Sequence, residues 1–332
     1  MDAAALPALA DLRARAHVVS LPLVTRFRGV DHREALLLEG PEGWTEFSPF
    51  LEYDDAEAAT WLSAALDFGW RPQPAPVRAA VPVNATVPAL AAADVPAVLA
   101  RFDGCRTAKV KVAERGQTLA DDVARVRAVR ATMGPEGRIR VDANAGWNVD
   151  EAEHAVHALA EFDLEYLEQP CARVDELAEL RERIADWDIP IAADESVRKA
   201  SDPLAVARAG AADLVVVKAQ PLGGVSRALQ IVADAGLPAV VSSALDTSVG
   251  LSMGLALAAA LPDLPYDCGL GTASLLAADV TRTPLRPRGG ALPLGRVDVD
   301  AGLLRTHAAS PERQEWWLRR LERCLALLPQ AS

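Results

Sequence analysis

The sequence predicts an α/β protein, in which an eight-stranded (β/α) barrel of the TIM type follows a small N-terminal α+β capping domain. Strand-like and helix-like segments alternate through residues 76–285. Charged residues at the ends of four successive apolar runs are separated by 26, 26 and 24 residues, from Asp142 through Glu168 and Asp194 to Lys218. Each separation is long enough for a strand, a helix and two loops. The repeat therefore predicts parallel strands joined by crossover helices.

The first part of the chain has a different pattern, which predicts a capping domain over residues 1–75. Three short apolar runs separated by turn residues predict three antiparallel strands, at 17–25, 34–38 and 44–47. A helix is expected at 54–68, because Trp61, Leu62, Ala65 and Phe68 recur at helical spacing. A proline-rich connector at 71–76 then marks the boundary with the barrel.

The barrel domain is predicted to span residues 76–285. Its eight expected strands are 81–85, 107–112, 138–143, 164–169, 189–194, 214–218, 239–243 and 266–270. Helices are expected between them at 93–102, 149–162, 173–187, 203–209 and 224–235. Eight is the number of strands that closes a barrel whose interior side chains can fill.

The remainder of the chain, residues 286–332, is predicted to be a tail that packs on the barrel or on the capping domain, and the sequence leaves that choice open. Its only strong signal is a terminal helix at 314–328, preceded by a short apolar run near Val297. The longest apolar run of the chain, at 249–261, is too short to cross a bilayer and ends at Pro262. It predicts a helix in the core rather than a membrane span.

Composition narrows the possible partners. The 332 residues carry a formal net charge of -12, which argues against nucleic acid or an anionic membrane as the main partner. Four cysteines are widely scattered without C-x-x-C spacing, as expected for free thiols in a reducing compartment. Charges interrupt the first 16 residues, which therefore lack the pattern of a secretory signal. A cytoplasmic enzyme is expected, with the oligomeric state left open and compatible with a monomer.

Three carboxylates at the ends of predicted strands three, four and five indicate a metal site. They are Asp142, Glu168 and Asp194. Neighbouring strands of a barrel bring such side chains together, and three carboxylate ligands with open positions suit Mg²⁺, with Mn²⁺ as an alternative ion. Zinc is less favoured, because no His or Cys lies at a nearby strand end.

Three lysines complete this group of charges. Lys109 and Lys111 lie two residues apart on predicted strand two and so point to the same side, whereas Lys218 lies on strand six, across the barrel. This arrangement suits proton transfer at a carbon next to a carboxylate, with the metal stabilising the enediolate. Nearby positive charge would lower the pKa of Lys111 from its usual value of about 10.4, which makes Lys111 the expected base and Lys109 its electrostatic partner.

Each of these residues also has an ordinary structural explanation. A single Asp at a strand end is often a helix cap, Lys-x-Lys is typical of a solvated edge strand, and Lys218 could be a surface lysine. Six charges at the same end of consecutive strands favour the functional interpretation. Ser242 and Ser243 lack the G-x-S-x-G setting of a nucleophilic serine.

The combined pattern resembles the enolase superfamily, and within it the muconate-lactonizing-like subgroup, which has Lys-x-Lys on strand two and a lysine on strand six. The strand-three segment 140–147 (RVDANAGW) and the strand-seven segment 241–251 (VSSALDTSVGL) are most similar to the o-succinylbenzoate synthase family. The strand-eight segment 267–272 (DCGLGT) lacks the Asp-x-Asp of dipeptide epimerases. The resemblance covers nearly the whole chain and implies the superfamily's modified TIM barrel and capping domain.

The resemblance implies a Mg²⁺-dependent lyase of menaquinone biosynthesis. Its reaction is the syn dehydration of 2-succinyl-6-hydroxy-2,4-cyclohexadiene-1-carboxylate to o-succinylbenzoate and water. Lys111 would remove the proton and then protonate the departing hydroxide, while a protonated Lys218 would stabilise the anion from the other face. The alternatives are an N-succinylamino acid racemase or dipeptide epimerase of the same superfamily, and a barrel without catalytic activity that only binds a carboxylate or a partner protein.

The resemblance also implies which residues bind the small carboxylate substrate. They are Arg140, Asn144, Ser242, Ser243, Gly269, Leu270 and Arg26. Capping-domain loops at 26–29 and 47–50 are expected to close the mouth of the barrel above them.

Overall fold

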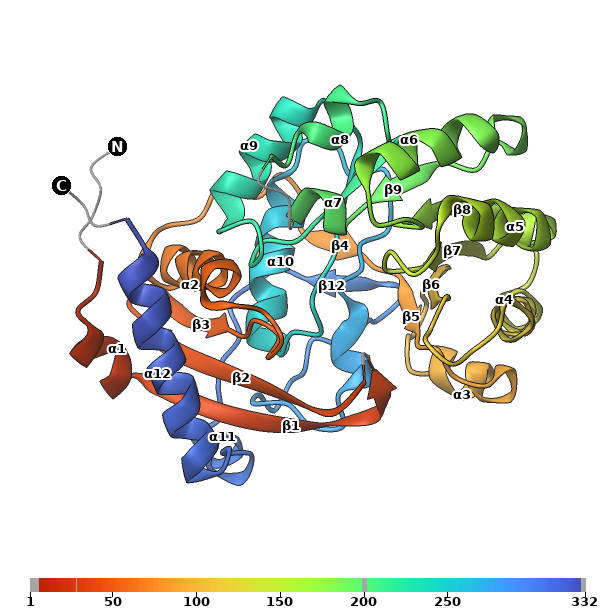
Figure 1. Cartoon of the computed structure of the whole chain (residues 1–332). Helices are drawn as coiled ribbons and strands as arrows, with labels where there is room; N and C mark the ends of the chain where they lie inside the picture. Colours follow the sequence, from red (N-terminus) through yellow and green to blue (C-terminus); the bar gives the residue numbers. More distant parts are fainter. Residues whose placement is uncertain (1–5, 28, 199–201, 330–332) are drawn as a thin grey trace.

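The computed structural model describes residues 6–27, 29–198 and 202–329 (Figure 1). The capping domain contains a three-stranded antiparallel sheet in the order β1-β2-β3. Its strands are β1 (Ala16–Phe27), β2 (Val30–Gly40) and β3 (Gly43–Phe47). Helix α2 (Asp55–Trp70) packs on this sheet. A short helix α1 (Leu9–Ala14), which the sequence did not predict, precedes β1 in the chain. The three strands and α2 lie where the sequence predicts them.

Local sequence explains why α2 begins and which face it buries. The Asp54 side chain accepts a hydrogen bond from the Glu57 amide at 2.8 Å and so caps the first turn. Trp61, Leu62 and Phe68 are buried against the sheet and the barrel, as their helical spacing predicts.

The barrel is a seven-stranded parallel sheet in the order β11-β10-β9-β8-β7-β6-β5. Its strands are β5 (Ala85–Val87), β6 (Thr107–Lys111), β7 (Arg138–Asp142), β8 (Leu164–Glu168), β9 (Ile191–Ala193), β10 (Leu214–Val217) and β11 (Ala239–Val241). The segment around Cys268 and Gly269 closes the ring through parallel bridges to Val83 and Ser242. The predicted fold class is therefore confirmed, although the eighth strand is reduced to these two bridges.

The first predicted barrel strand, 81–85, is divided in two. Its first half is β4 (Ala80–Pro82), which pairs antiparallel with β12 (Ala291–Pro293) from the tail. The second half leads into β5, which joins the barrel beside β6. The division arises because the Val83 amide donates to Gly290 of the tail, whereas the next amide, that of Asn84, donates to Cys268 of the barrel.

Helices surround the sheet (Figure 1). They are α3 (Val95–Leu99), α4 (Leu119–Met133), α5 (Val149–Leu159), α6 (Val174–Arg183), α7 (Glu195–Arg198), α8 (Ala205–Arg208), α9 (Val225–Ala235) and α10 (Ser248–Ala260). The sequence prediction missed α4, although a capping box between Thr118 and Asp121 begins it. The apolar run at 249–261 is α10, a buried helix as predicted.

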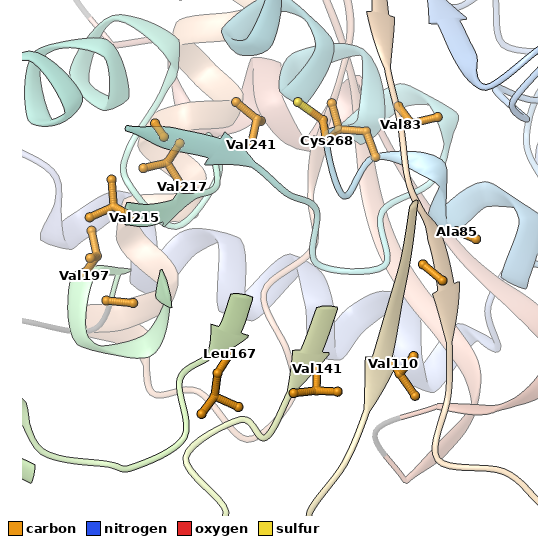
Figure 2. Close-up of a cluster of buried hydrophobic side chains, with 14 of the residues drawn as sticks. Val83, Ala85, Val110, Val141, Leu167, Val197, Val215, Val217, Val241 and Cys268 are labelled. Atoms are coloured by element: carbon orange, nitrogen blue, oxygen red, sulfur yellow. The ribbon is translucent and has the colours of Figure 1, made fainter. Parts of the chain in front are cut away.

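Alternation along the strands separates an apolar core from the charged site. Val110, Val141 and Leu167 from successive strands belong to one buried cluster with Val217 and Val241 (Figure 2). The residues on either side of them, which include both lysines of β6, therefore point into the barrel. The helices cover the apolar face. The barrel interior holds the charged side chains and, deeper down, a smaller apolar cluster of Tyr166, Ala192, Leu214, Val216 and Val240.

The tail contacts both other parts of the molecule. Besides β12 it forms α11 (Ala301–Thr306) and α12 (Pro311–Leu327), and α12 packs against α2 and β1. Glu34 on β2 accepts hydrogen bonds from Arg313 at 2.7 Å and from the Trp317 indole at 2.8 Å. Trp317 lies in one buried cluster with capping-domain residues such as Phe47. Within the described ranges, the chain forms no helix that could cross a bilayer.

Candidate active site

A pocket opens at the carboxyl ends of the barrel strands, beneath the capping domain. It encloses about 530 Å³, including the part open to solvent. The capping domain contributes an aromatic group to its lining, Phe27, Phe50, Tyr53 and Trp61. The strand-end residues of the lining include Lys109, Lys111, Asp142, Asn144, Asp194, Lys218, Ser242, Ser243 and Gly269.

The structure brings all six predicted charges together. Lys109 Nζ lies 2.8 Å from Glu168 Oε1 and 3.2 Å from Asp142 Oδ2. Lys111 forms an ion pair with Asp142 and donates to Asn144 Oδ1 at 2.6 Å. On the other side, Lys218 is paired with Asp194, which directly follows β9. The three carboxylates therefore lie between two lysines from β6 and one lysine that follows β10.

The two lysines of β6 differ in electrostatic environment. Burial lowers the pKa of Lys111, and the neighbouring charge of Lys109 lowers it further, although Asp142 opposes this. For Lys109, burial is outweighed by the carboxylates of Glu168 and Asp142, which raise its pKa. Groups with opposite pKa shifts are suited to different roles, here a base and a permanent cation.

The carboxylates also differ from one another. Burial works against the charged form of Asp142, but Lys111 and Lys109 hold its pKa well below the usual range. Lys218 and Arg198 do the same for Asp194. Burial, with Asp142 adding to it, raises the pKa of Glu168 to about 7. Glu168 is thus the carboxylate with the least compensated charge.

The donor chemistry of this group fits a hard divalent cation. All three side chains offer oxygen, and Glu168 Oε2 is buried without a hydrogen-bond donor among the described residues. The carboxylates are not already gathered into a cage, since no three Asp, Glu, His or Cys side chains of the described ranges lie close enough together to hold an ion. Ammonium groups contact each of them instead.

Backbone strain is concentrated at the same ends of the strands. Residues with positive φ that are not glycine follow β6, β7, β8 and β11, namely Ala113 (59°), Asn144 (46°), Ala145 (63°), Gln169 (36°) and Leu245 (62°). Such conformations cost on the order of 1–3 kcal/mol each and persist where the surroundings enforce them. The Gln169 amide oxygen, for example, accepts from the Asp194 and Ser196 amides at 2.9 and 3.1 Å. Gln169 thereby fixes the turn that carries Asp194, a role that the sequence analysis missed.

Four of the seven predicted substrate residues line the pocket, and three do not. Asn144, Ser242, Ser243 and Gly269 are in the lining. Arg140 is fully buried one layer below it, where its guanidinium lies 4.7 Å from the Tyr166 ring centroid. It points inward like Asp142, but two residues earlier on the strand.

The other two residues lie outside the pocket for different reasons. Leu270 is fully buried in the barrel core, next to Gly254 of α10. Arg26 is exposed and donates to the Gly29 carbonyl at 3.0 Å. Position 28 of the same predicted loop lies outside the described residues.

Arg198 lines the pocket and is a second residue that the sequence analysis missed. Its guanidinium contacts Asp194 Oδ1 at 3.0 Å, Glu195 Oε1 at 2.7 Å and the Tyr53 hydroxyl at 3.0 Å. It therefore links an expected metal ligand to the capping domain. The sequence feature that could have identified Arg198 is its position four residues after Asp194, one helical turn further along α7.

Comparison with known proteins agrees with this geometry. Residues 92–302 match the enolase C-terminal domain-like family, and residues 18–69 match the enolase N-terminal domain-like family. The o-succinylbenzoate synthase of Mycolicibacterium smegmatis is 56% identical over 97% of this chain and 99% of its own length. The chain belongs to the o-succinylbenzoate synthase family. A second relative from this family, in Mycobacterium tuberculosis, is 54% identical over 97% of both chains.

Solved structures support the fold of this o-succinylbenzoate synthase family member. The 2-chloromuconate cycloisomerase of Rhodococcus opacus superposes with a TM-score of 0.76 at 24% identity, covering 89% of this chain and 98% of that one. The N-succinyl Arg/Lys racemase of Bacillus cereus gives 0.73 at 19% identity, covering 89% and 97%. At these identities the likeness shows the fold alone. The predicted superfamily, family and lyase class are confirmed, and the racemase alternative is not favoured.

Proposed function

We propose that this pocket catalyses the syn dehydration of 2-succinyl-6-hydroxy-2,4-cyclohexadiene-1-carboxylate to o-succinylbenzoate and water, as a cytoplasmic step of menaquinone biosynthesis. The observation that carries the proposal is the placement of lysines on both sides of three carboxylates, with opposite pKa shifts in the two lysines of β6. The family relationship supports the choice of substrate.

Lys111 is the base in this proposal. Burial favours its neutral form, which takes the proton from the carbon next to the ring carboxylate. The C–H bond breaks, its electron pair moves into the conjugated ring system, and the C–O bond of the ring hydroxyl then breaks. Lys111 returns its proton to the departing hydroxide on the same face, so that water leaves and the ring becomes aromatic. Lys218, on the opposite face, stabilises the anion with its positive charge.

Asp142, Glu168 and Asp194 would hold Mg²⁺, or Mn²⁺ in its place, which supplies positive charge for the ring carboxylate of the substrate. Lys109 stays protonated between Glu168 and Asp142 and keeps both carboxylates oriented. Asn144, Ser242, Ser243 and Gly269 supply polar groups for the substrate, whereas Phe27, Phe50 and Trp61 cover it and exclude water.

The test is a direct assay of the purified chain with the cyclohexadiene acid and Mg²⁺. We expect Lys111→Ala to lose at least about 10³-fold in kcat while Mg²⁺ binding, measured by calorimetry, is kept. Arg127→Ala is the matched control, because Arg127 is an exposed cation on the outer helix α4. Full turnover by Lys111→Ala would refute the proposed base.

The same variants separate dehydration from racemisation. A racemase needs Lys111 and Lys218 as acid and base in turn, so both would be required to exchange the α-proton of an N-succinyl amino acid. Racemisation of that probe by the wild-type chain, with no conversion of the cyclohexadiene acid, would overturn the proposed dehydratase.

A further inference from the structure

Glu46 is a buried carboxylate of the capping domain that reaches the barrel. It lies on β3 and is fully buried. Its Oε2 accepts from the Thr247 amide at 3.1 Å, the Thr247 hydroxyl at 2.5 Å and the Gly250 amide at 3.1 Å. Its Oε1 accepts from the Ser48 hydroxyl at 2.5 Å. One side chain of the capping domain thus satisfies two amides at the start of α10, a helix of the barrel.

The start of α10 is shaped to accept this carboxylate. A Cβ added at Gly250 would lie 2.8 Å from both Glu46 Oε2 and Cδ, and 2.8 Å from Asp246 Cβ. A side chain at this position would collide with the carboxylate. Because Gly250 has no side chain, Glu46 can reach the backbone of the first turn of α10.

Arg33 makes a second connection from the capping domain to the same region. Its guanidinium donates to the Leu245 carbonyl at 3.2 Å and to the Ala244 carbonyl at 3.4 Å. It also donates to the Ser48 carbonyl and to the Ser48 hydroxyl, which itself donates to Glu46. Leu245 has the strained φ of 62°. Arg33 therefore holds a backbone conformation that a leucine rarely adopts.

The segment held in this way is one wall of the pocket. Ser242, Ser243, Ala244 and Leu245 all line it. On its other side, the Ser243 hydroxyl donates to the Gly269 carbonyl at 2.8 Å and lies 2.8 Å from the Thr272 hydroxyl. The wall is thus fixed by the barrel at Ser243 and by the capping domain at Ala244 and Leu245, and Glu46 holds Thr247 just beyond its end.

We propose that Glu46 and Arg33 are positioning residues, which fix the 242–245 wall and thereby set how tightly the pocket holds its substrate. The inference rests on the proposed function insofar as this wall contacts the substrate. Neither residue is among those lining the pocket. Arg33 acts through the wall carbonyls of Ala244 and Leu245, and Glu46 acts through Thr247 and the first turn of α10, which directly follow the wall. Loss of Glu46 leaves two buried amides unpaired and frees the wall without moving the lysines on β6.

The test compares four variants by steady-state kinetics and by amide hydrogen exchange of peptides covering 243–251. Glu46→Ala removes the four hydrogen bonds that Glu46 accepts. Gly250→Ala leaves Glu46 in the sequence but pushes its carboxylate away from α10. Glu46→Gln keeps an oxygen for the α10 amides and offers its amide group to the Ser48 hydroxyl. Glu39→Gln, at an exposed carboxylate of the same sheet, is the matched control.

We expect KM to rise about tenfold in Glu46→Ala and Gly250→Ala, with kcat within about threefold of wild type. Exchange of the 243–251 amides should be at least about fivefold faster in both. Glu46→Gln and Glu39→Gln should remain near wild type. Wild-type KM and exchange in Gly250→Ala, or in a folded Glu46→Ala, would overturn the proposal. If the wild-type chain lacked dehydratase activity, the exchange measurement would still decide whether Glu46 holds the wall.

Discussion

Replacing Arg140 by methionine tests whether this residue binds substrate, as the family resemblance implies, or supports the barrel. Its side chain is fully buried. Its Nε donates to Glu165 Oε2 at 2.5 Å, and its Nη1 donates to the Asp267 carbonyl at 2.6 Å and to Asn84 Oδ1 at 3.2 Å. These contacts tie together β7, β8 and the segment that closes the ring.

The size of the effect follows from these contacts. Methionine keeps most of the volume of the aliphatic part of the Arg140 side chain, so the cavity that it leaves lowers the free energy of unfolding only slightly. Removing one partner of a buried ion pair costs about 3–5 kcal/mol, but Glu165 keeps 18% of its side-chain surface exposed and is therefore partly solvated. The unpaired Asp267 carbonyl and the lost contact with the Tyr166 ring add to the cost. We expect Arg140→Met to lower the free energy of unfolding by about 3–4 kcal/mol.

Urea denaturation measures this loss, with Arg138→Met as the matched control. Arg138 lies two residues earlier on β7 and also pairs with Asp267, but its side chain is 50% exposed. Its replacement should cost about 1 kcal/mol or less. Adding Glu165→Gln to Arg140→Met should recover about 1–2 kcal/mol, because it removes a carboxylate whose remaining partner is the exposed Arg138 at 3.6 Å. An Arg140→Met variant with wild-type stability and a raised KM would refute this reasoning and place Arg140 in contact with substrate.

Three further predictions concern the metal, pH and the C-terminal helix. EDTA should abolish turnover and Mg²⁺ restore it, and Glu168→Gln should weaken Mg²⁺ binding by at least about tenfold in calorimetry; unchanged affinity would remove Glu168 from the ligand set. Burial raises the folded pKa of Glu46 from 4.5 to about 7, with the charge of Asp246 adding to the shift and that of Arg33 opposing it. The protonated form of Glu46 therefore stabilises the fold at low pH, and this stabilisation is lost as the pH rises through about 7. Glu46→Gln does not titrate, and its stability relative to wild type should increase between about pH 5 and about pH 8 in urea titrations; a constant difference contradicts this. Glu34→Ala should lower the free energy of unfolding by about 1–3 kcal/mol, since two donors of α12 lose their acceptor, and an unchanged thermal midpoint would show that this contact is dispensable.

The sequence was most informative where periodicity and chemistry agree. Val110, Val141 and Leu167 alternate with polar residues, so strand positions and their inward faces could be inferred, and with them the meeting of Lys109, Lys111, Asp142, Glu168, Asp194 and Lys218. Strand alternation shows which face of the sheet a side chain points to, but not at which level of the barrel it lies. Arg140 and Asp142 share the inward face, yet they are about 7 Å apart along the strand, which separates the floor of the barrel from its pocket.

Residues whose placement depends on loops could not be inferred in the same way. Gln169 and Arg198 act after their strands have ended, where backbone geometry rather than periodicity decides which neighbours a side chain meets. Helix α4 was missed because its buried face includes Asp122 and Arg125, which read as solvated residues in the sequence. In the fold they satisfy one another, and Arg125 also donates to the Lys111 carbonyl.

The position of α12 determines when the molecule can be completed as the chain is synthesised. Trp317 and Leu321 fill a core whose other members, including Phe47 and Trp61, are made near the start of the chain. The whole barrel is translated between them, so the part of the first sheet and of α2 that α12 covers must wait for that helix. A nascent chain therefore carries an uncovered aromatic surface during most of its synthesis, which is the kind of intermediate that chaperones protect. The barrel, whose neighbouring strands follow one another in sequence, can assemble during that interval, and the cap is completed last.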